Sequence, residues 1–195
     1  LRMRQPNFHV RIHENTPKAF YDEVIRINFG AGSAPAMYND ETIIESMMNV
    51  GYSLEDARNY VAIGCVEPTA PGKSLASTDA GMYNMPLAVE MALNEGKQFH
   101  SSKQIGAKTP PVSEMRSMDD FVAAYDTQVK HQLGKLRRDL EAIERFHAEH
   151  HPTPLTSSMV EGCVEQGVCS TSGGAIYNFS GIQGCGMAVV ADSLG

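Results

Sequence analysis

The chain has 195 residues, a length that fits one domain or a piece of a larger protein. Its 42% hydrophobic and 20% charged residues are typical of a folded protein and exclude a disordered one. A net charge of −7 argues against nucleic acid or an anionic membrane as a partner, and no apolar run approaches the ~20 residues that span a bilayer.

The first part of the chain predicts alternating strands and helices. FHVRI at residues 8–12 alternates in polarity, which indicates a strand. Pro17 suits the first position of a helix over FYDEVIRI. After the turn-rich segment GAGSAP and the short extended piece AMYND, Asn39 or Asp40 can cap a helix over ETIIESMMNV, which Gly51 ends.

The next segment predicts a short helix and then a strand. Ser53 can cap this helix, with Asp56 in the capping-box position. The following run YVAIGC is apolar on both faces, as buried strands are. TAPGKSLAST is expected to be a loop. MYNMPLAVEMAL then has a helical pattern in which Pro86 is an irregularity.

The second half of the chain is mainly helical. After the hydrophilic connection KTPPVSEMRS, one long amphipathic helix is expected from Met118 to about His150. Its expected buried stripe consists of Phe121, Val122, Tyr125, Val129, Leu133, Leu136, Leu140 and Ile143. Two more helices are expected over LTSSMVEGCVEQG and MAVVADSL. The alternation of strands and helices predicts an α/β fold with parallel strand pairing.

The cysteines and the chain ends bear on the cellular context. The four cysteines contain no Cys-x-x-Cys pair, so neither a disulfide framework nor a metal site is expected, and a reducing cytoplasm suits this usage. Three of them, Cys163, Cys169 and Cys185, are expected to be small buried hydrophobes. The chain starts without methionine or a signal-peptide pattern and ends within a predicted helix, so we expect an internal fragment.

A cysteine and a glutamate lie two residues apart in the segment YVAIGCVEP. In an extended backbone, the side chains of Cys65 and Glu67 project to the same face about 6.5–7 Å apart, which leaves room for a small molecule between them. Pro68 disfavours a helix at Glu67, so the segment stays extended or turns sharply. By composition alone, the pair also fits a core cysteine beside a surface glutamate.

The carboxylate looks out of place beside a nucleophilic cysteine. A neighbouring negative charge suppresses the thiolate form on which ordinary cysteine catalysis depends. Either the pair is accidental, or Cys65 does not act as a thiolate. Its position after a predicted buried strand favours a functional site, because open α/β sheets and barrels place their sites at strand ends.

Two long segments resemble stretches of the glycyl radical enzymes. MYNDETIIESMMNVGYSLEDARNYVAIGCVEP is similar to the segment with the radical cysteine in the branch that contains diol dehydratases, choline lyase, hydroxyproline dehydratase and isethionate lyase. GGAIYNFSGIQGCGMAVVADSLG resembles a stretch further downstream in the same family. The resemblance covers nearly the whole chain, and GCVEP is its specific core.

The resemblance implies that Cys65 works as a neutral thiyl radical, which explains how a carboxylate can stand next to it. The radical would originate on a glycine outside this chain, installed by an activating enzyme that uses S-adenosylmethionine and an iron–sulfur cluster. Cys65 would abstract a hydrogen atom from a glycerol-like or propanediol-like substrate, and Glu67 would act as general base while water or another group leaves. Gly64 stands where pyruvate formate-lyase has a second cysteine, so thioester chemistry is disfavoured.

The resemblance also implies that two further residues bind the substrate. The family's glycerol and propanediol dehydratases use an aspartate at the offset of Asp79 to hold substrate hydroxyls, and a carboxylate can accept from two hydroxyls at once. Thr78 is expected to contribute to the same pocket. The alternative is that Asp79 caps the next helix, since it follows Ser77 and Thr78.

The resemblance also implies a fold and partners. Residues 1–195 would be part of a single pyruvate formate-lyase-like domain, an α/β fold that forms a portion of a ten-stranded barrel with surrounding helices. The N-terminal half and the C-terminal glycyl radical loop would be absent, so we expect the fragment alone to be inactive and to bind no cofactor. The full-length enzyme of anaerobic metabolism would be a cytoplasmic homodimer, with a bacterial microcompartment as an open alternative location. Its partners would be a small-molecule substrate and the activating enzyme.

Other functions stay open at this point. A radical arylacetate decarboxylase shares the Cys-x-Glu step, and a truncated paralogue could bind or assemble without catalysis. The histidines of HAEHH fall at the polar end of the long helix, which favours a solvated helix end over a metal site. The glycine-rich segments lack the strand and helix context of a nucleotide-binding loop.

Overall fold

The computed structural model describes residues 7–32 and 34–195. Expectations about the chain's first residues fall on residues 1–6 and lie outside this description, as does residue 33 of the expected GAGSAP turn. The chain divides into two compact units. Unit 1 contains residues 1–78 and 153–179, and unit 2 contains residues 79–152 and 180–195.

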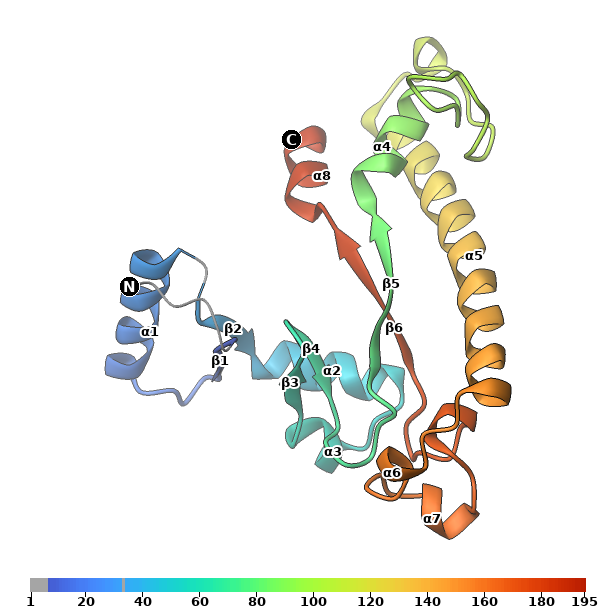
Figure 1. Cartoon of the computed structure of the whole chain (residues 1–195). Helices are drawn as coiled ribbons and strands as arrows, with labels where there is room; N and C mark the ends of the chain where they lie inside the picture. Colours follow the sequence, from blue (N-terminus) through green and yellow to red (C-terminus); the bar gives the residue numbers. More distant parts are fainter. Residues whose placement is uncertain (1–6, 33) are drawn as a thin grey trace. The chain divides into compact units, whose positions relative to one another are not determined.

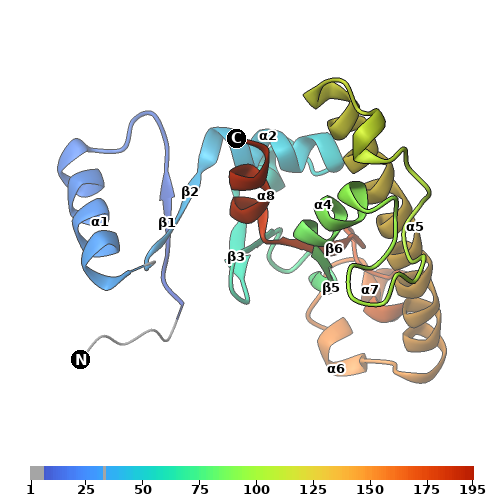
Figure 2. The same ribbon diagram turned by 90° about the horizontal axis from the view of Figure 1, so that it is seen from above.

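Unit 1 begins with a parallel strand pair joined by a helix. Strand β1 (His9–Ile12), helix α1 (Lys18–Ala31) and strand β2 (Ala36–Asn39) follow one another, and β1 pairs in parallel with β2 in the register His9 to Ala36. Figures 1 and 2 both show α1 alongside this pair, which is the arrangement of a strand–helix–strand crossover. Pro17 is the residue before the first helical turn, one position earlier than expected.

The next two helices begin and end as the sequence predicts. Asn39 caps α2 (Asp40–Val50) by accepting from the Thr42 N–H at 3.1 Å, and Gly51 ends α2 in the left-handed conformation. Helix α3 (Leu54–Arg58) is short, and Ser53 caps it. The core of this region consists of the buried side chains Tyr38, Met47, Ala57 and Tyr60.

The segment expected to form a buried strand forms one strand of an antiparallel hairpin instead. Strands β3 (Val61–Ile63) and β4 (Glu67–Thr69) pair in an antiparallel manner, and a three-residue turn joins them. The expectations of burial and of parallel pairing are therefore wrong for β3, where Val61 is exposed. The prediction failed because a short apolar run does not distinguish a fully buried strand from one that is only half covered by neighbouring side chains.

The remainder of unit 1 is more broken than expected. The single helix expected over LTSSMVEGCVEQG is two short helices, α6 (Pro154–Ser157) and α7 (Cys163–Gln166), followed by the 3₁₀ helix η2 (Ser170–Ser172). Gly162 separates the two helices with a φ of +93°, and a Cβ there would lie 2.7 Å from the Gly174 carbonyl oxygen. This close approach of two backbone segments explains the break.

Unit 2 is built on a strand pair and three helices. Strand β5 (Ser77–Asn84), whose first two residues belong to unit 1, pairs with β6 (Ser180–Cys185), and their arrows point the same way in Figure 1. Helix α4 (Met85–Leu93) packs against α5 (Met118–His150) and α8 (Met187–Leu194). The expected helix start at Met82 is wrong, because the strand continues to Asn84 and Pro86 lies in the first helical turn, where proline is tolerated.

The long helix α5 has the expected length, but its buried face differs in part from the prediction. A capping box between Ser117 and Asp120 begins the helix, and the 3₁₀ helix η1 (Val112–Glu114) precedes it. Leu140 is buried as expected, whereas Val122 and Ile143 of the predicted stripe are exposed. A buried polar side chain, Gln128, lies on this face and bonds both backbone groups of Ala107.

The described residues form a mixed fold of helices and three two-stranded sheets. Helix–strand alternation and one parallel pair agree with the α/β expectation. The ten-stranded barrel remains a prediction.

Candidate functional site

Cys65 lies in the middle of the turn between β3 and β4. This turn, residues 64–66 and called the Cys65 turn below, places the cysteine at the tip of the hairpin, and its side chain is exposed. Glu67 is the first residue of β4 and is buried, with 7% of its surface exposed. The two residues expected to act together therefore lie in one hairpin.

The Glu67 carboxylate folds back beneath the Cys65 turn. Its Oε2 accepts hydrogen bonds from the backbone N–H of Cys65 at 2.9 Å and of Val66 at 3.0 Å. Gly64 makes room for this contact, because a Cβ on Gly64 would lie 2.6 Å from the same oxygen, and its φ of +56° favours glycine. The expectation of an extended Cys65–Glu67 segment is wrong: the segment takes the sharp turn that Pro68 also allowed.

Two side chains from the segment before and within β1 reach the other side of the Cys65 turn. The Asn7 side-chain amide donates to the Gly64 carbonyl at 3.0 Å. The His9 Nε2 donates to the Cys65 carbonyl at 2.6 Å. Sequence reasoning missed both residues, because they lie more than fifty positions upstream of their partners and belong to no recognisable motif.

A network of polar side chains lies next to β1. The Arg11 guanidinium binds both oxygens of Asp40, at 2.8 and 2.9 Å, and the Tyr60 hydroxyl donates to Asp40 at 2.7 Å. Burial by itself would raise the pKa of Asp40, but the bonds from Arg11 and Tyr60 outweigh it and lower that pKa. The guanidinium also lies 4.1 Å from the centre of the Tyr60 ring.

Thr78 and Asp79 are consecutive residues of β5. Asp79 is exposed, and Thr78 is half-buried with its hydroxyl 3.5 Å from the Ala76 carbonyl. Successive side chains of a strand point to opposite faces, so the expectation that both line one pocket does not fit a regular β5. The alternative role of Asp79 as a helix cap is wrong, because the next helix begins after Asn84.

The other cysteines divide into different environments. Cys163 is buried as expected, whereas Cys185 is exposed and Cys169 is half-buried. Hydrogen bonds with Ser157, Thr171 and Thr153 lower the pKa of Cys169 to about 5. The expectation of a buried hydrophobe is therefore wrong for Cys169 and Cys185.

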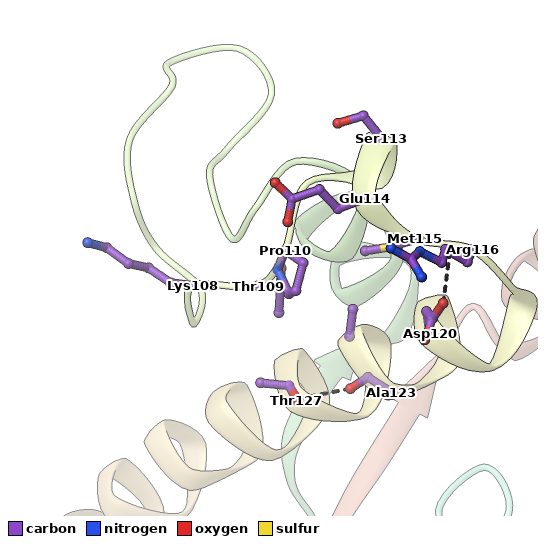
Figure 3. A pocket seen from close by; sticks show the side chains of 11 residues that line it. Lys108, Thr109, Pro110, Ser113, Glu114, Met115, Arg116, Asp120, Ala123 and Thr127 are labelled. Carbon is purple, nitrogen blue, oxygen red and sulfur yellow. Dashed lines mark hydrogen bonds between the residues drawn. The ribbon is translucent and has the colours of Figure 1, made fainter.

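Two surface cavities are lined by residues other than those of the Cys65 turn. One, of about 820 Å³ in unit 2, is bounded by residues 108–116 and the first turns of α5 (Figure 3). Figure 3 shows Asp120 at the start of α5 accepting from the Arg116 backbone, a bond of 2.8 Å that fixes this helix end. The other, in unit 1, is lined in part by Arg11 and Asp40.

Residues 7–32 and 34–195 contain no group of three or more histidine, cysteine, aspartate or glutamate side chains that could hold a metal ion. Within the same ranges, every helix is too short or too polar to cross a bilayer.

Comparison with known proteins places these features in context. A family model described as pyruvate formate lyase-like matches residues 1–195. A (2S)-3-sulfopropanediol dehydratase of Klebsiella oxytoca is 37% identical over 99% of this chain and 23% of its own length. The glycerol-bound B12-independent glycerol dehydratase from Clostridium butyricum is 40% identical with a TM-score of 0.84, over 99% of this chain and 24% of that structure.

A further solved structure, a glycyl radical enzyme from Archaeoglobus fulgidus, is 36% identical with a TM-score of 0.83, and the match covers 99% of this chain and 25% of that one. The chain thus spans about a quarter of the length of the relatives that it matches.

Proposed function

Because the chain belongs to the pyruvate formate lyase-like family of glycyl radical enzymes, we propose that it carries the radical cysteine and the base of a dehydratase for a small hydroxylated substrate such as glycerol or propanediol. The observation that supports this most strongly is the Cys65 turn. It presents the thiol at the tip of a hairpin, while the neighbouring carboxylate is buried directly beneath the same backbone. The activating enzyme and a homodimeric assembly belong to the same proposal.

The proposed reaction begins with Cys65. A glycine radical elsewhere in the full-length protein takes the hydrogen atom of the Cys65 S–H bond, which forms a C–H bond on that glycine and leaves the unpaired electron on the sulfur. The sulfur then takes a hydrogen atom from a substrate C–H bond, which forms an S–H bond and leaves the unpaired electron on carbon. No thiolate is needed for this step, so the nearby carboxylate does not oppose it.

Glu67 acts in the next step of the proposed reaction. It accepts the proton of the hydroxyl on the radical carbon, and that proton leaves with the hydroxyl of the adjacent carbon as water. Return of the hydrogen atom from Cys65 gives an aldehyde and restores the sulfur radical. A carboxylate has about four acceptor sites, so Glu67 can accept from the backbone of the turn and from a substrate hydroxyl at the same time.

Asp79 is the proposed partner of the remaining substrate hydroxyls. Its carboxylate is exposed on β5 and can accept hydrogen bonds from two hydroxyls at once. Such binding would hold a diol so that a hydrogen atom is abstracted from one particular carbon. Thr78 points to the other face of a regular strand, so it takes the lesser part in this proposal.

The test uses the full-length protein, activated without oxygen by its activating enzyme. We expect a glycyl radical in the electron paramagnetic resonance spectrum and aldehyde formation from glycerol or 1,2-propanediol. Cys65→Ala should keep the glycyl radical and lose turnover. Glu67→Gln should also keep the radical, because the amide oxygen can still accept from Cys65 and Val66, but its turnover should fall by roughly 100-fold or more.

Glu165→Gln is the matched control, because the Glu165 carboxylate likewise accepts a backbone N–H, that of Gly162 at 2.9 Å. It should keep full turnover. Wild-type turnover in Glu67→Gln would refute the role of the base. Decarboxylation of an arylacetate without diol turnover would replace the dehydratase by the decarboxylase alternative. A protein that forms no radical would favour the non-catalytic paralogue.

A further inference from the structure

Four backbone polar groups of the Cys65 turn are held by side chains outside the turn. Glu67 accepts from the N–H groups of Cys65 and Val66 on one side. Asn7 and His9 donate to the carbonyls of Gly64 and Cys65 on the other. The peptide groups before and after the Cys65 Cα are therefore both anchored, and the side-chain torsion is the main freedom left to the sulfur.

The two upstream donors come from an anchored part of unit 1. His9 opens β1, which is held along its length by parallel pairing with β2. Two residues further on, Arg11 ties β1 to Asp40 through two hydrogen bonds and donates a third to the Arg58 carbonyl. A side chain held by a strand with such support is placed more accurately than one on a free loop.

The His9 ring is oriented by a neighbour on β2. Tyr38 meets it edge-on, with the ring centres 5.7 Å apart and the planes at 70°. Tyr38 is only 8% exposed. Burial raises the pKa of its hydroxyl, and the negative charge of Glu67 raises it further. Its packing keeps the His9 Nε2 directed at the Cys65 carbonyl.

We propose that Asn7 and His9 are positioning residues for Cys65, which hold the two carbonyls of its turn so that the sulfur meets the substrate from one fixed direction. The inference rests on the proposed function of Cys65. Transfer of a hydrogen atom requires close contact between sulfur and the C–H bond, and a displacement of about 1 Å can cost roughly 100-fold in rate. A three-residue turn at the tip of a hairpin would not keep that accuracy by itself.

Two variants separate hydrogen bonding from packing. His9→Phe keeps a ring against Tyr38 but removes the donor to Cys65, whereas His9→Gln keeps a side-chain N–H. His13→Phe is the matched control, because His13 lies four residues later, just after β1, and its exposed side chain accepts only from the nearby Asn15 N–H, at 3.2 Å. All variants are made in the full-length protein.

The first measurement is steady-state turnover of the activated enzymes. For His9→Phe we expect kcat to fall about tenfold or more, with KM, glycyl radical content and melting temperature close to wild type. His9→Gln should recover most of the lost kcat, and His13→Phe should match wild type. Asn7→Leu should lower kcat in the same sense. A fall in radical content or melting temperature that accounts for the lost kcat, or no recovery in His9→Gln, would overturn the proposal.

The second measurement does not depend on the proposed reaction. In the unactivated full-length protein, the alkylation rate of Cys65 by iodoacetamide is followed by peptide mass spectrometry. Loss of the His9 donor should loosen the turn, so His9→Phe should change this rate at least about threefold, while His9→Gln and His13→Phe stay near wild type. If the wild-type enzyme turns over no diol but the rate changes, the proposed function fails and the positioning contact stands. An unchanged rate in His9→Phe overturns the positioning role whatever the activity shows.

Discussion

Gly64 and Glu67 depend on each other at the scale of single residues. The Glu67 carboxylate can reach the N–H groups of Cys65 and Val66 because Gly64 has no Cβ in its path. The same oxygen that supports the turn belongs to the proposed base. Glu67 thus fixes the backbone around Cys65 and also lies close enough to serve as the proposed base. This double role accounts for the spacing of the two residues.

We predict that Gly64→Ala disables the site without unfolding the protein. The new Cβ would fall 2.6 Å from Glu67 Oε2, so the carboxylate must move, and a φ of +56° adds roughly 1–2 kcal/mol of backbone strain. We expect turnover in the full-length enzyme to drop at least about tenfold while the glycyl radical persists.

Gly72→Ala is a matched control for this prediction. Gly72 has a similar φ of +71° but nothing within 4 Å of the added Cβ, so it should show the strain without the loss of turnover. Equal turnover of the two variants would mean that the Gly64–Glu67 contact has no functional weight.

Some residues of the site can be recognised in the sequence and others cannot. Cys65 and Glu67 are recognisable because they are close together in a distinctive motif. Asn7 and His9 carry no such signal, since their partners are brought to them only when the hairpin folds against the segment before and within β1. Tyr38 is likewise an unremarkable tyrosine until its ring is seen against His9.

At the scale of elements, the short helix α3 is held in place by the Asp56 side chain, which bonds to residues far away in the sequence. The sequence predicts that Ser53 and Asp56 form a capping box, and Ser53 Oγ does accept from the Asp56 N–H. The Asp56 carboxylate, however, also accepts from Lys73 at 2.7 Å and from the Tyr177 hydroxyl at 2.7 Å. Asp56, predicted only as part of a helix cap, therefore also links α3 to Lys73 and Tyr177 within unit 1.

We predict an acid-dependent contribution of Asp56 to stability. The bonds from Lys73, Tyr177 and Ser53 lower its pKa from 3.8 to about 2. A carboxyl whose pKa is lowered on folding stabilises the folded state above its unfolded-state pKa, and this contribution is lost as the pH falls from about 4 to about 2. Asp56→Asn should cost roughly 1.5–3 kcal/mol near pH 7.

The measurement is the difference in urea midpoint between wild type and Asp56→Asn as a function of pH. The difference should be constant between pH 5 and about 7 and should shrink below about pH 4. Asp126→Asn is the control, because Asp126 pairs with Lys130 on the exposed surface of α5 and should change stability by less than about 1 kcal/mol. A difference that does not vary with pH would contradict the charge-based explanation.

At the scale of the whole molecule, many large apolar side chains are exposed. Phe29 is 86% exposed, Leu155 76% and Met187 69%. Exposed apolar surface on this scale is typical of faces that pack against further protein. It fits the finding that the chain spans about a quarter of its relatives' length.

We predict that residues 1–195 expressed alone bind a hydrophobic dye and self-associate. The driving force is the exposed apolar area, which gains about 25 cal/mol for each Å² removed from water. Dye fluorescence per mole of chain should exceed that of the full-length protein several-fold, and light scattering should rise with concentration. The full-length protein is the control. A monomeric, dye-negative fragment would contradict this prediction.

The sequence by itself determined the positions of several helices, and it led to the proposed chemistry of the site. Caps and helix ends at Asn39, Gly51 and Ser53 were recognisable because they depend on neighbours a few residues away. The Cys65–Glu67 motif identified the family for the same reason. The sequence also predicted a mixed fold of helices and strands.

The tertiary structure decided what depends on residues far apart in the chain. The hairpin at β3 and β4, the break at Gly162 and the burial of Gln128 each follow from the approach of a distant backbone segment. The same holds for the anchoring of the Cys65 turn by Asn7 and His9. Local propensity fixes the ends of an element, but the contacts that direct a side chain form only when the chain folds, so no pattern in the sequence reveals them.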